Sequence, residues 1–272
     1  NGITLINVLP MEDYLKGVVP SEIVPSWRMD AIKAQAVAAR TYATYHRNGY
    51  RSSGYDVTDD TRTQVYRGFS AETAATNRAV SETAGEVVTY AGKPIDALFH
   101  SSGGGFTENS ENVWGSVIPY LRGVKEESST YLMTPWKKTM TRASFTKSLE
   151  NAGYKIGDLK SIKLSHLKKG EANHSSDRGI SGRVKSVVFV GKKGRATVSG
   201  ERLQRLYGLD STLFDISAKG KELTITGYGY GHGLGLSQWG AEAMAEKHGD
   251  GKNYYKTILS HYFTGTKIEK IY

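Results

Sequence analysis

The chain has 272 residues, enough to bury a substantial core in one large domain or two smaller ones. Its 38% hydrophobic content argues against disorder, and the lack of cysteine excludes disulfides, thiolate metal sites and cysteine nucleophiles. The formal net charge of +9 favours an anionic partner such as nucleic acid, a membrane surface or an acidic wall polymer, or else describes an ordinary solvated surface.

Strands and helices alternate in the first part of the chain. Residues 3–9 predict a strand, and residues 10–19 predict a short helix that opens with proline and acidic residues. Ser26 is a plausible N-cap for a long, Ala-rich helix over residues 27–47, which we expect to be central. Residues 59–66 lead from a loop into a predicted strand, and residues 71–84 predict a second helix. A hairpin follows, with strands over residues 86–90 and 95–100.

The composition becomes rich in Ser and Lys from about residue 126, and this middle third is the candidate insert. Its predicted elements are a strand, a helix, two strands and a helix, over residues 136–140, 142–152, 184–190, 195–198 and 200–207. A hairpin follows, with strands over residues 213–217 and 222–226, and then a glycine-rich stretch over residues 227–235. Two helices are predicted after it, over residues 237–248 and 254–263.

Together these elements predict an α+β fold. Mixed helices and antiparallel sheet form a core around the long Ala-rich helix, and a smaller α/β arm is inserted into it. We expect residues 1–125 and 208–272 to form the core and residues 126–207 to form the arm. The chain begins Asn-Gly without Met, so we expect an anchor or signal segment to have preceded it.

The glycine run at 227–235 places glycines at alternate positions, outside the G-x-G-x-x-G frame of nucleotide loops. In a strand, alternate glycines leave one face bare, which suits close approach of a backbone or of an extended polymer. His232 lies in the middle of this run, as a structural histidine or as a ligand contact. The stretch Gly235 to Trp239 misses the G-x-S-x-G pattern, and no H-E-x-x-H metal motif occurs.

Glu22 is a single carboxylate in the apolar, proline-bracketed stretch GVVPSEIVPSW, residues 17–27. In an apolar setting, desolvation raises the pKa of a carboxyl group, and a glutamate can then act as a general acid near neutral pH. The alternative is an ordinary surface glutamate in a turn. The local pattern leaves both open.

Other polar residues lie at positions where a ligand could be met. Lys33 and Arg40, seven residues apart, share one face of the long helix, as partners of other groups or as exposed charges. His100 ends a predicted strand that continues into the polar, glycine-rich sequence Ser101-Ser102-Gly103-Gly104-Gly105.

Three blocks of the sequence, in order, resemble the stage II sporulation protein D family, which includes the amidase enhancers of bacterial cell walls. They are MEDYLKGVVPSEIVPSWRMDAIKAQAVAARTYA, FHSSGGGFTENSENVWGSVIPYLRGV and GYGHGLGLSQWGAEAMA. The resemblance implies a peptidoglycan lytic transglycosylase that remodels septal wall during engulfment of the forespore. It also implies that Glu22 is the single catalytic acid, cleaving the MurNAc–GlcNAc bond with formation of 1,6-anhydroMurNAc.

The matched blocks supply candidate substrate-binding residues, which we expect to line a cleft around Glu22: Lys33, Arg40, His100, Ser101, Ser102, His232, Ser237 and Gln238. Some relatives place cysteines six and twelve positions after the histidine of the second block, where a metal can bind. Phe106 and Asn112 stand there in this chain, so we expect no metal and no cofactor.

Expected partners are peptidoglycan glycan strands, a cell-wall amidase and membrane-anchored engulfment proteins, with no nucleic acid. The expected location is extracytoplasmic, in the cell envelope, either anchored to the membrane or secreted. The alternative function is a non-catalytic, wall-binding enhancer of an N-acetylmuramoyl-L-alanine amidase, which would need no carboxylate in an apolar pocket.

Overall fold

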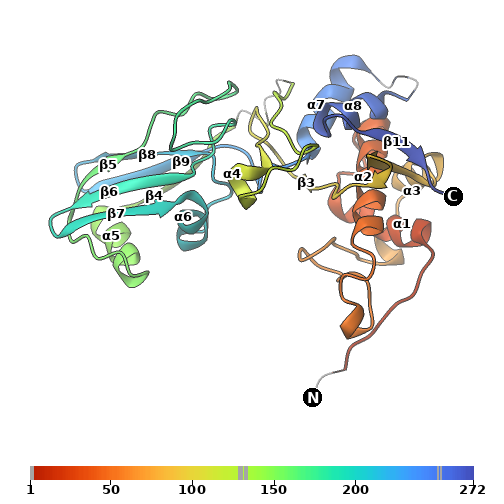
Figure 1. Cartoon of the computed structure of the whole chain (residues 1–272), viewed down its shortest axis with the longest axis horizontal. Helices are drawn as coiled ribbons and strands as arrows, with labels where there is room; N and C mark the ends of the chain where they lie inside the picture. The colour runs from red at the N-terminus through yellow and green to blue at the C-terminus, as the bar shows by residue number, and fades with distance from the viewer. Residues whose placement is uncertain (1–2, 128–130, 132–133, 250, 252) are drawn as a thin grey trace. The chain divides into compact units, whose positions relative to one another are not determined.

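The computed structural model describes residues 3–127, 131, 134–249, 251 and 253–272. The chain divides into two compact units, Asn1–Phe99 with Ala241–Tyr272, and His100–Gly240. The helices and antiparallel sheets confirm the predicted α+β class (Figure 1). The predicted arm, residues 126–207, falls within the second unit, apart from residues 128–130 and 132–133, which lie outside the described residues together with the first two residues of the chain.

One helix, α2 (Met29–Tyr45), is the centre of the first unit. Its buried side chains lie on all sides rather than along one stripe, which confirms the prediction of a central Ala-rich helix. The predicted cap is wrong, because Arg28 and not Ser26 occupies the N-cap position. Around it pack three helices and a strand: α1 (Met11–Glu22), α3 (Ala74–Glu82), α8 (Tyr254–Tyr262) and β1 (Glu86–Tyr90).

A three-stranded antiparallel sheet with the order β11-β1-β2 completes the first unit. The last strand, β11 (Lys267–Lys270), pairs with β1, and the two-residue β2 (Lys93–Pro94) pairs with the other edge of β1. Two 3-10 turns, η1 (Arg51–Ser53) and η2 (Phe69–Ala71), interrupt the long loop between α2 and α3. Helix α7 (Gln238–His248) carries the chain back from the second unit into the first.

The second unit contains two three-stranded antiparallel sheets, with the orders β4-β9-β8 and β5-β6-β7. Their strands are β4 (Trp136–Thr141), β5 (Leu159–Lys163), β6 (Ser186–Gly191), β7 (Gly194–Ser199), β8 (Phe214–Lys219) and β9 (Glu222–Gly227). A short ladder joins β3 (Phe99–His100) to β10 (Leu236–Ser237), and the helices are α4 (Ser110–Trp114), α5 (Arg142–Asn151) and α6 (Gly200–Tyr207).

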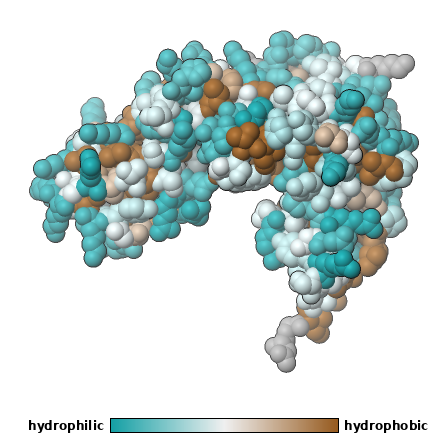
Figure 2. Space-filling view, in the orientation of Figure 1, coloured by the Kyte–Doolittle hydropathy of each residue, from teal (hydrophilic) through white to brown (hydrophobic). Residues whose placement is uncertain are grey.

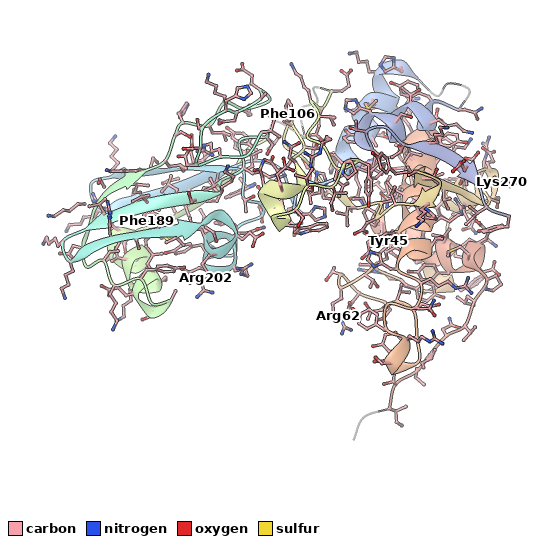
Figure 3. All side chains as sticks on the ribbon, in the orientation of Figure 1. Tyr45, Arg62, Phe106, Phe189, Arg202 and Lys270 are labelled. Carbon is pink, nitrogen blue, oxygen red and sulfur yellow. The ribbon has the colours of Figure 1, made fainter. Side chains whose placement is uncertain are left out.

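The core of the second unit lies between its sheets and helices. Phe145 of α5 packs against Phe189 of β6, labelled in Figure 3, and stacks on Tyr207 of α6 with 4.6 Å between ring centres. Ser199 caps α6 by accepting the backbone N–H of Arg202, the role that serine favours just before a helix. The predicted helices 142–152 and 200–207 are thereby confirmed.

Two strands predicted in the first unit are not formed. Residues 3–9 take no strand conformation, and their apolar side chains Ile3, Leu5 and Val8 are about nine-tenths exposed. The segment after Asp59 runs through Tyr66 as an irregular loop. A strand requires a neighbour to satisfy its backbone hydrogen bonds, and among the described residues no strand lies beside either segment.

The predicted strand 95–100 is also shortened, because regular structure is confined to Lys93–Pro94 and Phe99–His100. None of the helices in the described ranges combines the length and the apolar character that crossing a bilayer requires.

Candidate functional site

Glu22 is the last residue of α1, which runs three residues beyond the predicted helical end. Pro20 lies inside the final turn and removes one backbone donor there. The turn is nevertheless closed, because the Ser21 hydroxyl donates to the carbonyl of Gly17 and the Ile23 N–H donates to the carbonyl of Val19. The carboxyl group therefore projects from a fixed helix end rather than from a flexible turn.

Gly17 allows the loop before η2 to lie against α1. A Cβ atom at this position would lie 2.4 Å from the ring of Tyr66, closer than real contacts allow. The Arg67 N–H donates to the Gly17 carbonyl, which holds the loop onto the helix. Close packing at this glycine brings the Val65 N–H to Glu22, where it donates to Oε1 at 2.8 Å.

Gln64 anchors the same loop from the other side. It is fully buried, its Nε2 donates to the Ala39 carbonyl of α2, and its Oε1 accepts the Tyr14 hydroxyl. The Tyr14 ring also stacks on Tyr66. The loop that contacts Glu22 is thus tied to both α1 and α2.

Burial raises the pKa of Glu22 above its usual range, against the opposing effect of the hydrogen bond from Val65. The side chain is half-buried, which favours the first of the two interpretations that the local sequence leaves open. Burial, followed by the charge of Asp96 and smaller effects that include Glu22, raises the pKa of Tyr42 to about 12. Burial, followed by the charge of Glu22, also raises the pKa of Tyr14. Both tyrosines therefore stay protonated at neutral pH.

The two predicted cations of α2 both have carboxylate partners. The Lys33 ammonium pairs with Glu82, and the fully buried Arg40 forms a bidentate pair with Glu12 at 2.8 and 2.7 Å. The Arg40 guanidinium also donates to the carbonyls of Glu86 and Val80. This position gives Arg40 a structural role, and a substrate contact for either cation stays a prediction.

Two predicted histidines, His100 and His232, are brought together in the second unit by the backbone of Leu234. The Nδ1–H of His100 donates to the Leu234 carbonyl, and the Leu234 N–H donates to Nδ1 of His232. The rings lie 5.4 Å apart. Burial, then the charges of His232 and Arg183, hold the pKa of His100 well below its usual range, so His100 is neutral with its proton on Nδ1.

The predicted serines lie in the same part of the second unit. The buried Ser237 hydroxyl oxygen accepts the N–H groups of Gly103 and Gly240, each at 3.2 Å. Ser102 forms a backbone bridge with Tyr230, and the Ser101 carbonyl accepts the Trp239 N–H. Gln238 follows Ser237 in the chain as the first residue of α7, and it is buried as well.

The glycine run is not a strand, which corrects the prediction made from its alternation. Gly229, Gly231, Gly233 and Gly235 all have positive φ, a conformation that breaks a strand and favours glycine. A Cβ atom at Gly229 would meet the Ser102 carbonyl, and one at Gly233 would overlap the Arg183 guanidinium. These glycines admit the protein's own backbone and side chains, which is the first of the two uses that the sequence suggested.

Two buried charged residues of the second unit, Arg183 and Glu126, were not predicted from the sequence. Arg183 is fully buried, burial lowers its pKa to about 10, and it donates to the carbonyls of Gly231 and Gly103. Glu126 is buried too, accepts the Gly105 N–H at 2.7 Å, and has a pKa raised by burial. No sequence motif marks Arg183 or Glu126, and their burial follows from contacts between segments that are distant in the sequence.

Phe106 and Asn112 occupy structural positions. Phe106 forms a backbone bridge with Lys125, and the Asn112 side-chain amide donates to Glu108. Within the described ranges, His, Asp and Glu residues form no group of three or more that could hold a metal ion.

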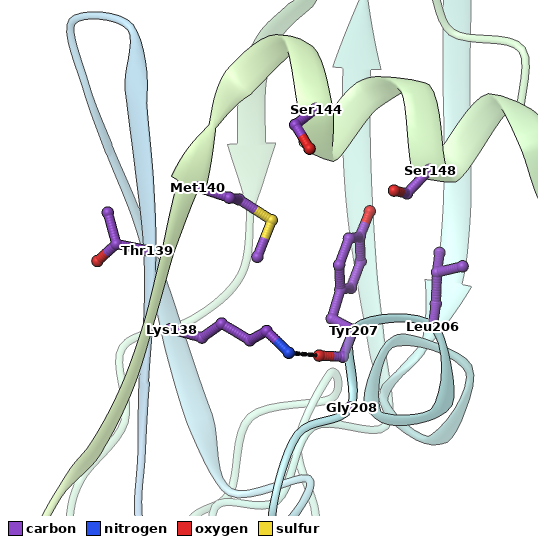
Figure 4. Close-up of a pocket in the computed structure, with 8 residues that line it drawn as sticks. All are labelled: Lys138, Thr139, Met140, Ser144, Ser148, Leu206, Tyr207 and Gly208. Carbon is purple, nitrogen blue, oxygen red and sulfur yellow. Dashed lines mark hydrogen bonds between the residues drawn. The ribbon is translucent and has the colours of Figure 1, made fainter.

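A shallow pocket of about 460 Å³ lies elsewhere in the second unit, between β4, α5 and α6 (Figure 4). The Lys138 ammonium crosses it to donate to the Tyr207 carbonyl. It contains none of the predicted site residues. The candidate site thus consists of two sets of residues, one around Glu22 in the first unit and one around His100 and His232 in the second, and their convergence in one cleft stays a prediction.

Comparison with known proteins places this architecture in a family. Residues 1–90 match the family model described as Stage II sporulation protein, and residues 105–235 match one described as a domain of unknown function, DUF8618. The second match nearly coincides with the second compact unit. The chain belongs to the stage II sporulation protein D family.

Individual relatives match nearly the whole chain. Stage II sporulation protein D of Bacillus subtilis is 34% identical over 96% of this chain and 75% of its own length. An uncharacterized protein of Brachyspira hyodysenteriae is 35% identical over 97% of this chain and 68% of its own. The amidase enhancer of Bacillus subtilis is 33% identical over 93% of this chain, which covers only 40% of that longer protein.

Proposed function

We propose that this chain is a lytic transglycosylase that cleaves the MurNAc–GlcNAc bond of peptidoglycan, with Glu22 as the catalytic group. The observation that carries the proposal is the environment of Glu22. The carboxyl group is half-buried, its pKa is raised by burial, and a backbone N–H fixes its orientation. A carboxyl group with a raised pKa can hold a proton near neutral pH and donate it.

The reaction needs one group that acts twice. Because Oε1 accepts the Val65 N–H, the proton of the neutral acid resides on Oε2. Oε2 donates this proton to the bridging oxygen as the bond from that oxygen to C1 of MurNAc breaks. The C6 hydroxyl of the same sugar then attacks C1 and returns its proton to Glu22, which closes the 1,6-anhydro ring without consuming water. A hydrolase would instead need a second carboxyl group.

The test is digestion of purified peptidoglycan, with and without stem peptides, followed by mass spectrometry of the products. Glu22→Gln keeps the shape and the acceptor for Val65 but cannot donate a proton, so anhydro products should fall by about a hundredfold or more. The matched control is Glu246→Gln, at an exposed position of α7, which should retain full activity. Unchanged glycan with the wild-type protein would overturn the proposal.

The second candidate function is a non-catalytic enhancer of a cell-wall amidase, which the amidase enhancer relative favours. In this function the chain would bind the wall without cutting glycan and would accelerate an added amidase. Stimulation of the amidase that persists in Glu22→Gln, together with no anhydro product from the wild-type protein, would support the enhancer and exclude the transglycosylase.

The relatives named for stage II of sporulation support a role for this chain in sporulation, in remodelling of the cell wall. Peptidoglycan lies outside the cytoplasmic membrane, so the proposed activity places the protein in the cell envelope. Its partners there would be an amidase and membrane-anchored engulfment proteins.

A further inference from the structure

The positive charge of the chain belongs entirely to one of its two units. Residues 1–99 and 241–272 contain 15 Lys and Arg against 15 Asp and Glu, a net charge of zero. Residues 100–240 contain 21 Lys and Arg against 12 Asp and Glu, a net charge of +9. A basic surface that served only solubility would not need this division between units.

Within the second unit, cations gather where two hairpin turns lie at the same end of the sheets (Figure 1). The β6–β7 turn has the sequence Gly-Lys-Lys-Gly and the β8–β9 turn carries lysines on both sides of Gly220. We call this surface the basic end, and it consists of Arg142, Lys155, Lys160, Lys192, Lys193, Lys219 and Lys221. All are exposed except Arg142, which is partly buried.

Backbone hydrogen bonds join the pieces of the basic end. At the first residue of α5, the Arg142 N–H donates to the Lys221 carbonyl at 2.9 Å, and its guanidinium donates to the Leu159 carbonyl at 2.6 Å. The N–H groups of Lys192 and Lys193 donate to the carbonyls of Asp158 and Ile156. The two turns, the start of α5 and the start of β5 are therefore one connected surface, formed before any ligand arrives.

Carboxylates neutralise little of this surface. Among the described residues, Lys192 alone of the seven has a carboxylate partner within 4 Å, which is Asp158 at 2.7 Å. Side chains coloured as hydrophilic project from this end in the space-filling view (Figure 2). The other six have no carboxylate partner within the part of the chain that the structure describes, and the five exposed lysines among them can pair with an external anion.

The surroundings of the basic end define the kind of anion. In the described parts of residues 134–229, no large apolar side chain is exposed. The surface therefore offers no apolar wedge for a bilayer and no aromatic ring on which a nucleobase could stack. The cations lie on turns rather than along a helix that could enter the major groove of DNA. What remains is recognition by charge of a flexible anionic chain.

We propose that the basic end binds a flexible anionic polymer whose units are joined by phosphodiester bonds, as in the acidic polymers of a bacterial wall. This binding is independent of Glu22 and of the proposed glycan cleavage. It holds the second unit to an anionic matrix through several weak contacts, each of which releases a counterion.

The experiment measures binding of a labelled poly(glycerol phosphate) by fluorescence anisotropy over a range of salt concentrations. The test variant is Lys193→Gln/Lys219→Gln/Lys221→Gln. Loss of three phosphate contacts should flatten the slope of log K against log salt by about 2 and weaken binding at low salt by about tenfold to a hundredfold. The control variant, Lys147→Gln/Lys168→Gln/Lys185→Gln, removes the same charge from other exposed sites of the second unit and should change affinity less than about threefold.

Short duplex DNA and vesicles of anionic phospholipid serve as competing ligands, and unfolding midpoints check that both variants are folded. Preferential loss of polymer binding in the test variant supports the proposal. Equal losses in both variants would show that net charge alone acts, and tighter binding of DNA or vesicles would assign the surface to those ligands. Either result, or no binding of the polymer, overturns it. Glycan cleavage is measured separately, so a failure of one proposal leaves the other intact.

Discussion

The backbone N–H of Val65 lies 2.8 Å from Oε1 of Glu22 and donates a hydrogen bond that opposes the effect of burial on this carboxyl group. Two influences therefore set the acidity of one residue, and they come from different parts of the chain. Helix α1 places Glu22 in its half-buried position, and the loop before η2 supplies the hydrogen bond.

The carboxyl group of Glu22 should titrate above the usual range for a glutamate. Because the folded-state pKa is raised, the protonated form contributes stability that is present below the unfolded-state pKa and is lost as the pH rises through the folded-state pKa. Carbon-13 NMR titration of the glutamate carboxyl groups, compared with Glu22→Gln, identifies the signal. Glycan cleavage should decline over the same pH interval, and a normal pKa would contradict the assignment of Glu22 as an acid.

Gly17→Ala should destabilise the protein by about 1–3 kcal/mol, because the new Cβ atom overlaps the Tyr66 ring. In an ordinary helix the same change would stabilise it by up to about 1 kcal/mol. Chemical denaturation measures the sign. The double variant Gly17→Ala/Tyr66→Leu removes the ring and should recover part of the loss, whereas an unchanged double variant would show that the contact is not responsible.

Gln64→Leu should raise the pKa of Glu22 further. The change removes the hydrogen bonds to Tyr14 and Ala39, so the loop loosens and its bond to Glu22 weakens. The falling limb of the pH profile for cleavage should therefore move to higher pH. Gln204→Leu, on α6 of the other unit, is the control. A lower rate with an unshifted profile would mean that Gln64 supports folding alone and does not position Glu22.

Arg40→Lys should cost about 2–4 kcal/mol of unfolding free energy, because lysine cannot form the bidentate pair and leaves Glu12 poorly compensated. Lys16→Met, which breaks an exposed pair with Asp13, should cost less than about 1 kcal/mol. If Arg40 instead contacts substrate, Arg40→Lys would raise KM while the unfolding midpoint stayed unchanged.

Acidification should weaken the second unit through His100. Its folded-state pKa is depressed, so it contributes stability that is present above the unfolded-state pKa and is lost as the pH falls toward the folded-state pKa. Nitrogen-15 NMR should find the proton on Nδ1 at neutral pH. His100→Gln should flatten the loss of stability between about pH 7 and pH 5, whereas His174→Gln, at an exposed site, should not.

Much of the fold could be predicted because periodic, capped elements carry local signals. The Ala-rich pattern of α2 and the Ser199 cap of α6 are sufficient to place those helices. The failures have a common cause. Residues 3–9 have the composition of a strand but find no pairing partner among the residues that the structure describes, and the glycine run alternates like a strand while its backbone takes positive φ. Neither the lack of a pairing partner nor the backbone conformation of the glycine run can be predicted from the local residue pattern.

The sequence singled out individual residues of the candidate site but not the contacts between them. The apolar neighbours of Glu22 leave a raised pKa and an ordinary surface carboxylate both open, and burial in the structure decides for the raised pKa. No sequence pattern predicts that the loop of Gln64 and Val65 contacts Glu22. Nor does any pattern predict that the backbone of Leu234 orients two histidines. For Arg40, the spacing on α2 left a partnered group and an exposed charge both open, and the partner Glu12 comes from a different helix.

The final segment of the chain is tied to the beginning of the first unit. Strand β11 pairs with β1, Asp30 of α2 accepts the Tyr255 N–H at the start of α8, and the Tyr272 hydroxyl donates to Glu12 of α1. During synthesis the ribosome makes residues 100–240 before this closing segment emerges. The second unit therefore has time to fold while α1 and α2 still wait for their last partners. The helix end that carries Glu22 thus reaches its final packing only after residues 241–272 have been made.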